Sequence, residues 1–171
     1  GIKTHTVRAY FDILEDTLIG YRIPAYTKVL KRRLIHAPKF YFFDVALPHY
    51  LLNRTSLAQG TIEYGRAFEH FIIQELVAYI GYNHKSEKLS YWRTQTGVEV
   101  DAVIGDAKVA IEIKSTDNIQ NKHLKGLKSF VSDYPGARPI VVSLDKITRK
   151  IDDINVYYVY DFLSALWKGE I

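Results

Sequence analysis

The alternation of apolar and polar residues is sharpest in the stretch VEVDAVIGDAKVAIEIKS (98–115). Apolar side chains recur at every second position on both sides of Gly105-Asp106, which is a typical turn dipeptide. This pattern predicts a β-hairpin whose strands each have one apolar face and one face with charged groups. The charged positions are Glu99, Asp101, Glu112 and Lys114.

The expected register brings these charges together. An even-numbered loop centred on Gly105-Asp106 pairs Glu99 with Glu112. Asp101 is then diagonal to Glu112, within about 7–8 Å, so three carboxylates and Lys114 converge on one surface. Like charges across a strand pair destabilise it unless a cation lies between them. Mg²⁺ would suit this surface, because it is a hard ion bound by carboxylates, waters and phosphate oxygens. A charged sheet face in contact with solvent is the alternative interpretation.

Around this hairpin, the hydrophobic periodicity predicts further helices and strands. Apolar residues at helical spacing run from Thr61 to Ile80, and Gly81 is the expected end of that helix. Glu69 lies beside its apolar stripe. The remaining elements are a strand over 89–94, a helix over 118–134, strands over 138–144 and 155–159, and a closing helix over 160–168.

The first 58 residues predict a smaller unit. It consists of a helix over 4–16, strands over 18–26 and 39–44, and a short helix over 46–52. The polar connector 53–60 then marks a boundary, so we expect an N-terminal appendage over 1–58 and a main domain over 59–171. The appendage is similar to half of a winged-helix unit, and a packing element without a ligand is the alternative.

Charge is unevenly distributed along the chain. The net charge is +4, yet residues 1–60 hold nine Lys and Arg against four Asp and Glu. Such a basic region attracts polyanions, although an ordinary solvated surface explains it equally well. The candidates for contacts with nucleic-acid phosphates are Lys31, Arg32 and Arg33, together with Lys122 and Lys125 on the helix over 118–134.

Composition narrows the function classes. With 171 residues and 47% hydrophobic content, the chain can bury a sizeable core. The absence of cysteine excludes disulfides, thiolate zinc sites and thiol catalysis, and no GxxxxGK[ST] phosphate loop occurs. No apolar run approaches a membrane span of about 18 residues and no signal segment opens the chain, so we expect a cytoplasmic protein. The start at Gly1 without Met indicates a fragment of a longer polypeptide.

The charged residues of the predicted hairpin carry a family resemblance. Asp101, ten further residues and then Glu112-Ile113-Lys114 resemble the D…(D/E)xK signature of the restriction-endonuclease-like, or PD-(D/E)XK, nuclease superfamily. Val100 stands where that signature has proline, and Glu69 fits the glutamate that the superfamily carries on the preceding helix. The resemblance implies a mixed α/β (α+β) fold with an αβββαβ core, in which helices flank a central mixed sheet.

The chain also resembles a narrower family, the nuclease-like C-terminal domain that follows an AAA-type ATPase module in many bacterial and archaeal proteins. The resemblance rests on TVRAYFDILEDTLI, PKFYFFDVAL, GRAFEHFIIQEL, GVEVDAVI and AIEIKS. It implies that the full-length chain carries an N-terminal AAA-type ATPase domain.

These resemblances imply a Mg²⁺- or Mn²⁺-dependent nuclease that hydrolyses DNA phosphodiester bonds. Asp101, Glu112 and the backbone carbonyl of Ile113 would hold the metal, with Glu69 as a further catalytic residue. Lys114 would orient the attacking water or offset the developing charge. The alternative is a non-catalytic module that binds DNA or a protein and regulates the attached ATPase.

Overall fold

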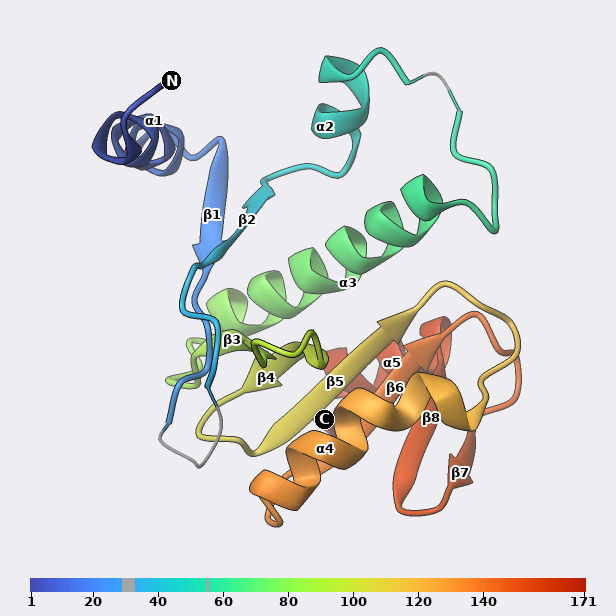
Figure 1. The fold of residues 1–171 in the computed structure, drawn as a ribbon. Coiled ribbons are helices and arrows are strands. Elements are labelled where there is room, and N and C mark those ends of the chain that lie inside the picture. The colour runs from blue at the N-terminus through green and yellow to red at the C-terminus, as the bar shows by residue number, and fades with distance from the viewer. Residues whose placement is uncertain (29–32, 55) are drawn as a thin grey trace.

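The computed structural model describes residues 1–28, 33–54 and 56–171, which form a mixed α/β fold (Figure 1). A six-stranded mixed sheet runs in the order β3-β4-β5-β6-β8-β7. Its strands are β3 (Leu89–Arg93), β4 (Glu99–Ile104), β5 (Val109–Lys114), β6 (Arg138–Ser143), β7 (Arg149–Ile151) and β8 (Ile154–Tyr158). The predicted class, a central mixed sheet flanked by helices, is confirmed. The restriction-endonuclease-like core stays a prediction.

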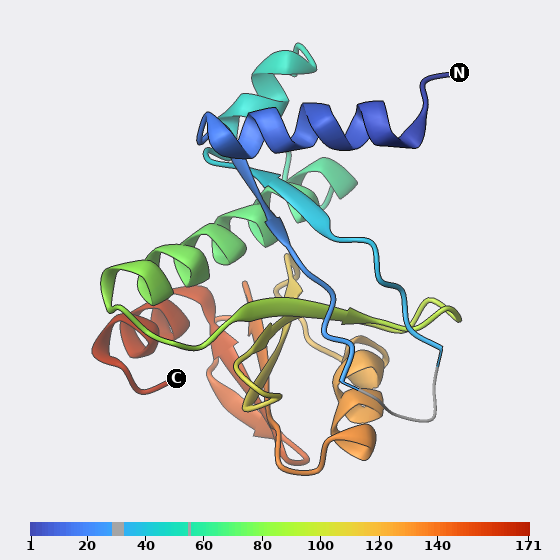
Figure 2. The ribbon, with the colours of Figure 1, turned by 90° about the vertical axis from the view of Figure 1, so that its left-hand side faces the viewer.

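Helices cover both faces of this sheet (Figure 2). On one face, α3 (Ile62–Tyr82) and α5 (Val159–Lys168) bury a core with β5 and β6 that includes Ile72, Leu76, Ile111, Ile140 and Phe162. On the other face, the 3₁₀ helix η1 (Asn121–Leu124) and α4 (Lys125–Asp133) bury a second core, which includes Trp92, Val100, Leu127, Phe130 and Val141. No helix in the described ranges is both long and apolar enough to cross a bilayer.

The N-terminal part has α1 (Thr4–Asp16), β1 (Gly20–Ile23), β2 (Lys39–Phe42) and α2 (Ala46–Leu51), as the sequence predicts. β1 and β2 form a separate antiparallel pair, and neither α1 nor α2 has a buried residue. The segments next to β1 and β2 lie along the free edge of β3, where Tyr26 N–H donates to the Tyr91 carbonyl and Ile35 N–H donates to the Arg93 carbonyl at 2.9 Å.

The hairpin between β4 and β5 has a different register from the predicted one. Ile104 pairs with Val109 and Ala102 with Ile111, so the turn has four residues, Gly105–Lys108. The expected pairing of Glu99 with Glu112 is therefore wrong. The shift is two positions, which by itself preserves the faces of both strands. Val100 and Ala102, which the alternation predicts on one face of β4, nevertheless lie in opposite cores, because β4 is irregular between them. Continued along the strands, the observed register brings Asp101 of β4 next to Glu112 of β5.

Candidate active site at the acid end of the central hairpin

Asp101 lies at a β-bulge between β3 and β4. The register of this pair shifts by one residue between Ser90 and Trp92, so that one residue of β3 faces both Asp101 and Ala102. A bulge re-aims the side chains of the bulged strand. Asp101 reaches the end of β5, where its Oδ2 accepts a hydrogen bond from the backbone N–H of Ile113 at 2.8 Å.

Lys114 lies between the two hairpin carboxylates. Its Nζ is 3.6 Å from Oδ2 of Asp101 and forms an ion pair with Oε1 of Glu112. Both carboxylates are buried, with 7% of Asp101 and 6% of Glu112 exposed. The structure thus brings together the three residues of the D…ExK pattern, at the end of the hairpin opposite its turn. We call this end the acid end and the other the turn end.

Burial dominates the electrostatics of both carboxyl groups. It raises the pKa of Glu112 to about 8, helped by the Asp101 charge and opposed by Lys114. It also raises the pKa of Asp101, against the lowering effect of Lys114. Oε2 of Glu112 is buried and has no hydrogen-bond partner among the described residues. A buried carboxyl oxygen without a partner is costly, so this atom calls for a proton or a cation.

The donor atoms at the acid end are of the chemical type that a divalent cation prefers. Asp101 and Glu112 supply hard oxygen atoms, and the orphaned Oε2 is free to accept a cation. Because the N–H and C=O of one strand residue point to the same edge, the carbonyl of Ile113 points to the side of Asp101. Within residues 1–28, 33–54 and 56–171, however, no three Asp, Glu, His or Cys side chains are already arranged to hold an ion.

Glu69 reaches the same place from α3. Its Oε1 accepts hydrogen bonds from Tyr41 Oη at 2.7 Å and from Lys39 Nζ at 3.0 Å. Lys39 Nζ also lies 2.6 Å from Oε1 of Glu99 and 4.0 Å from Oδ1 of Asp101. Burial raises the pKa of Glu69, but Lys39 and Tyr41 outweigh it and hold that pKa below its usual value. We define the acidic cluster as Glu69, Glu99, Asp101 and Glu112 with Lys39 and Lys114.

Helix α4 approaches the acidic cluster at Gly126. A Cβ atom added there would lie 2.0 Å from the backbone oxygen of Glu99 and 3.1 Å from Oε2 of Glu112. Glycine therefore allows the helix backbone to lie directly against β4. The helix covers the orphaned oxygen of Glu112 on this side.

A polar cavity of about 580 Å³ opens beside the acidic cluster. Its lining residues are Gln59, Gly60, Lys114, Ser115, Thr116, Asp117 and His123. Nδ1 of His123 accepts the backbone N–H of Gln120 at 3.1 Å, so the neutral ring carries its proton on Nε2. His123 was not among the predicted site residues, because a histidine on a lysine-rich helix has no distinctive spacing.

The predicted nucleic-acid contacts fall in different places. Lys31 and Arg32 lie outside the described residues. Arg33 is exposed beside the edge of β3, where its carbonyl accepts the N–H of Gln95. Lys122 and Lys125 are exposed on η1 and at the start of α4, on either side of the cavity residue His123 along the chain.

Sequence reasoning missed Lys39 and Tyr41, although one signal for them existed. The two residues are two positions apart on the predicted strand KFYFFD, so they share one face of that strand. Nothing local indicated that this face meets Glu69, which lies 30 residues beyond Lys39. Glu99 was placed on the charged face of the hairpin but was not assigned a role.

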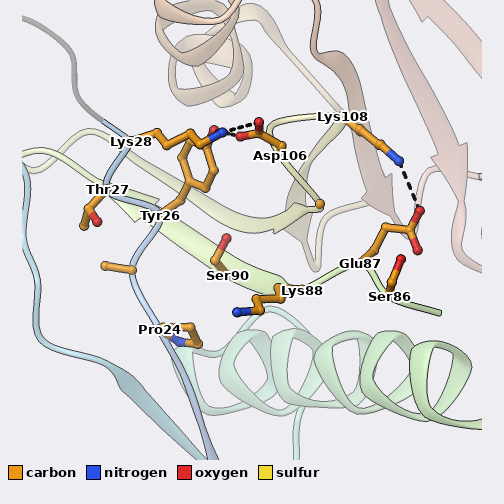
Figure 3. Close-up of a pocket in the computed structure, with 12 residues that line it drawn as sticks. Pro24, Tyr26, Thr27, Lys28, Ser86, Glu87, Lys88, Ser90, Asp106 and Lys108 are labelled. Carbon is orange, nitrogen blue, oxygen red and sulfur yellow. Dashed lines mark hydrogen bonds and ion pairs between the residues drawn. The ribbon is translucent and has the colours of Figure 1, made fainter. Parts of the chain in front are cut away.

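A larger cavity, of about 660 Å³, lies at the turn end and not at the acidic cluster (Figure 3). Tyr26, Lys28, Asp106, Glu87 and Lys108 are among its lining residues. Figure 3 shows Lys28 turned toward Asp106 and Lys108 turned toward Glu87, each in an ion pair. Both ammonium groups are paired and mostly exposed, and the described residues that line this cavity include no buried side-chain atom without a hydrogen-bond partner, unlike the acid end.

The chain matches families of known proteins and is similar in sequence to mycobacterial relatives. Residues 64–162 match the family described as Domain of unknown function (DUF4143), and residues 1–58 match Domain of unknown function (DUF8612). Uncharacterized protein Rv2008c of Mycobacterium tuberculosis and Uncharacterized protein Mb2031c of Mycobacterium bovis are each 31% identical to the chain over an alignment of 177 positions, which covers 95% of this chain. The chain spans only 38% of the length of these two relatives. No solved structure matches it.

Proposed function

The chain belongs to the family described as Domain of unknown function (DUF4143), and from this premise we propose that it is a Mg²⁺-dependent nuclease domain that hydrolyses DNA phosphodiester bonds. One observation carries the proposal. Asp101, Glu112 and Lys114 meet at the acid end, and there the buried Oε2 of Glu112 has no partner among the described residues. Mn²⁺ is the natural substitute ion, because it prefers the same oxygen ligands.

Each residue of the site has a separate role in this proposal. Asp101, Glu112 and the carbonyl of Ile113 would hold the metal, and the hydrogen bond from Ile113 N–H keeps the Asp101 carboxylate oriented. When bound, the ion supplies a Lewis acid for the phosphate and acidifies a water molecule. Lys114 stands beside both acids, where its ammonium group can hold the attacking water or offset negative charge on the phosphate. Glu69 assists from α3 by keeping this region negative.

The surroundings of Lys114 support phosphate as the group that meets it. The adjoining polar cavity of about 580 Å³ contains Ser115, Thr116 and His123, all able to donate hydrogen bonds to phosphate oxygens. Lys122 and Lys125 are exposed on the neighbouring helix and would contact the backbone of a bound strand. A nucleic acid rather than a small phosphate ester accounts for cations distributed beyond the cavity.

A second candidate function is regulation of an attached AAA-type ATPase through protein contacts. The observation that favours it is the exposure of large apolar side chains on the N-terminal part, including Tyr10, Leu18, Tyr50, Leu51 and Leu52. Patches of this kind mark interaction sites. The relatives that the chain matches are more than twice its length, which leaves room for such a module.

The test of the first function is thermal unfolding of the wild type with Mg²⁺ or Mn²⁺. An ion that binds only the folded state stabilises it by RT ln(1 + [L]/Kd), about 2.7 kcal/mol at 100 times Kd. We expect a raised Tm, and we expect Asp101→Asn to abolish the shift. Glu87→Gln, at the turn end, is the matched control and should keep it. If neither ion at about 10 mM changes the wild-type Tm, metal-dependent activity of the wild type is contradicted.

A further inference from the structure

The acidic cluster receives one of its two lysines from the N-terminal part of the chain. Lys39 is the first residue of β2, within the segment that matches a different family from the segment carrying the four carboxylates. Its Nζ lies 3.0 Å from Glu69, 2.6 Å from Glu99 and 4.0 Å from Asp101. One ammonium group therefore contacts carboxylates from α3 and β4 at once.

The position of Lys39 is well defined by its neighbours. The ammonium lies 5.2 Å from the centre of the Tyr91 ring, in a cation–π geometry, and only 23% of the Lys39 side chain is exposed. Tyr41, on the same face of β2, donates to the same oxygen of Glu69. Burial works against the charge of Lys39, but Glu69 and Asp101 outweigh it and raise its pKa, so Lys39 remains a cation.

We propose that Lys39 is an internal cation that competes with a divalent metal ion for the acidic cluster, so that the metal binds at full strength only when the Lys39 side chain leaves. The inference rests on the proposed metal at Asp101 and Glu112. It adds that the N-terminal part of the chain controls how strongly this metal is held.

Charge repulsion underlies the competition. Asp101 offers Oδ1 to Lys39 and Oδ2 to Lys114, so its two oxygens are already shared between two ammonium groups. A divalent ion on Asp101 would face the Lys39 ammonium at short range in a buried site, where charges are weakly screened. The four-carbon stem of Lys39 lets the ammonium leave without movement of β2.

The experiment compares Mn²⁺ titrations of wild type, Lys39→Met, Lys108→Met and Lys39→Met/Asp101→Asn by calorimetry and thermal unfolding. Methionine keeps an unbranched stem and removes the charge. We expect Lys39→Met to bind Mn²⁺ about tenfold or more tightly than wild type, because a unit positive charge close to Asp101 is gone. Its Tm should be lower without metal and recover when Mn²⁺ is added. Lys108→Met should match wild type, and the double variant should not bind.

The outcomes separate this inference from the proposed function. Equal Mn²⁺ affinity in wild type and Lys39→Met overturns the role of Lys39 and leaves the metal site standing. Binding in neither protein overturns both. Binding in Lys39→Met alone supports the competition and contradicts metal-dependent activity of the wild type.

A second measurement uses the wild type and does not depend on the folding of a variant. Amine acylation followed by mass spectrometry reports whether the Lys39 side chain is accessible. We expect Mn²⁺ to increase the labelling of Lys39 severalfold and to leave the labelling of Lys108 unchanged. Labelling of Lys39 that stays constant while Mn²⁺ binds would overturn the proposal.

Discussion

The two ends of the central hairpin carry the same residue types in opposite surroundings. At the turn end, Lys108 pairs with Glu87 and Lys28 with Asp106, and the two lysine side chains are 65% and 67% exposed. At the acid end, Lys114 pairs with carboxylates that are almost fully buried. Exposed pairs are screened by water and contribute about 0–1 kcal/mol, whereas buried charges are costly unless every atom is satisfied.

A glutamate beside a lysine therefore behaves differently at each end. The hydrogen bond from Lys108 lowers the pKa of Glu87 below its usual value. Burial raises the pKa of Glu112 to about 8, although Lys114 forms an ion pair with it. The sign of the pKa shift is therefore set by the burial of the glutamate and not by its lysine partner. Perturbed carboxyl groups of this kind concentrate at functional sites, so the difference supports the proposal that places the site at the acid end.

The largest difference between variants of the acid end and of the turn end is expected in DNA cleavage. Lys114→Ala should lower the cleavage rate by about 10² to 10³, the loss expected when one preorganised electrostatic donor is removed. Metal affinity should stay the same or increase, because a positive charge near the ion is removed. Lys108→Ala should leave the rate unchanged. The measurement is cleavage of labelled single-stranded and duplex DNA alongside a metal titration. Cleavage by Lys114→Ala at the wild-type rate would refute its assigned role.

A second contrast concerns the pH dependence of stability without divalent ions. The pKa of Glu112 is 4.5 when unperturbed and about 8 in the folded protein, so the folded state binds the extra proton between these values. The contribution of Glu112 to the free energy of unfolding should therefore fall as pH rises from 4.5 to about 8, by at most about 1.4 kcal/mol per pH unit. Glu112→Gln should flatten this slope.

Urea unfolding across that pH range measures the effect, and Glu87→Gln is the control. The lowered pKa of Glu87 contributes stability that is complete above 4.5 and is lost as pH falls through the folded pKa. Its replacement should leave the slope above 4.5 as in wild type. A wild type whose stability does not fall toward pH 8 would contradict the raised pKa of buried Glu112.

The smallest contrast is expected in nucleic-acid binding. If DNA lies over the acid end, Lys122→Ala and Lys125→Ala should each reduce the slope of log K against log salt by about 1. Lys108→Ala, at the turn end, should not change the slope. Fluorescence anisotropy at several salt concentrations measures it. Equal slopes in all three variants and wild type would direct the search to Arg33 at the edge of β3.

Local patterns predicted the order of the elements well, and they failed where geometry is set by single residues. The period-two alternation identified β4 and β5, but the turn was taken as centred on Gly105-Asp106. Ala107 adopts a φ of 53°, which non-glycine residues rarely do, and this lengthens the turn to four residues. β7 was missed because Arg149–Ile151 is too short for any periodicity to emerge.

The candidate site likewise has one part that the sequence predicted and one part that it did not. Asp101, Glu112 and Lys114 come from one hairpin, so the alternation along 101–114 predicts that they gather at one end of it. The register and the bulge at Asp101, which set their distances, are not visible in that alternation. Lys39 arrives from a strand of the N-terminal part, and its contact with Glu69 depends on how that strand packs against α3. Packing between distant segments is not encoded in any local period, so this contact could not be foreseen.

The outer edge of β3 bears on how the molecule avoids aggregation. Pro24 and Tyr26 bond to the backbone of Tyr91 in the middle of β3, and Ile35 bonds to Arg93 at its end. Arg33 bonds to Gln95, just beyond the strand. At the opposite edge, β7 offers only three residues. Unprotected edges are templates on which further chains stack into fibrils. The N-terminal part of the chain therefore covers this edge through residues next to β1 and β2, and it also carries Lys39, so protection against aggregation and the charge balance of the acidic cluster come from one part of the chain.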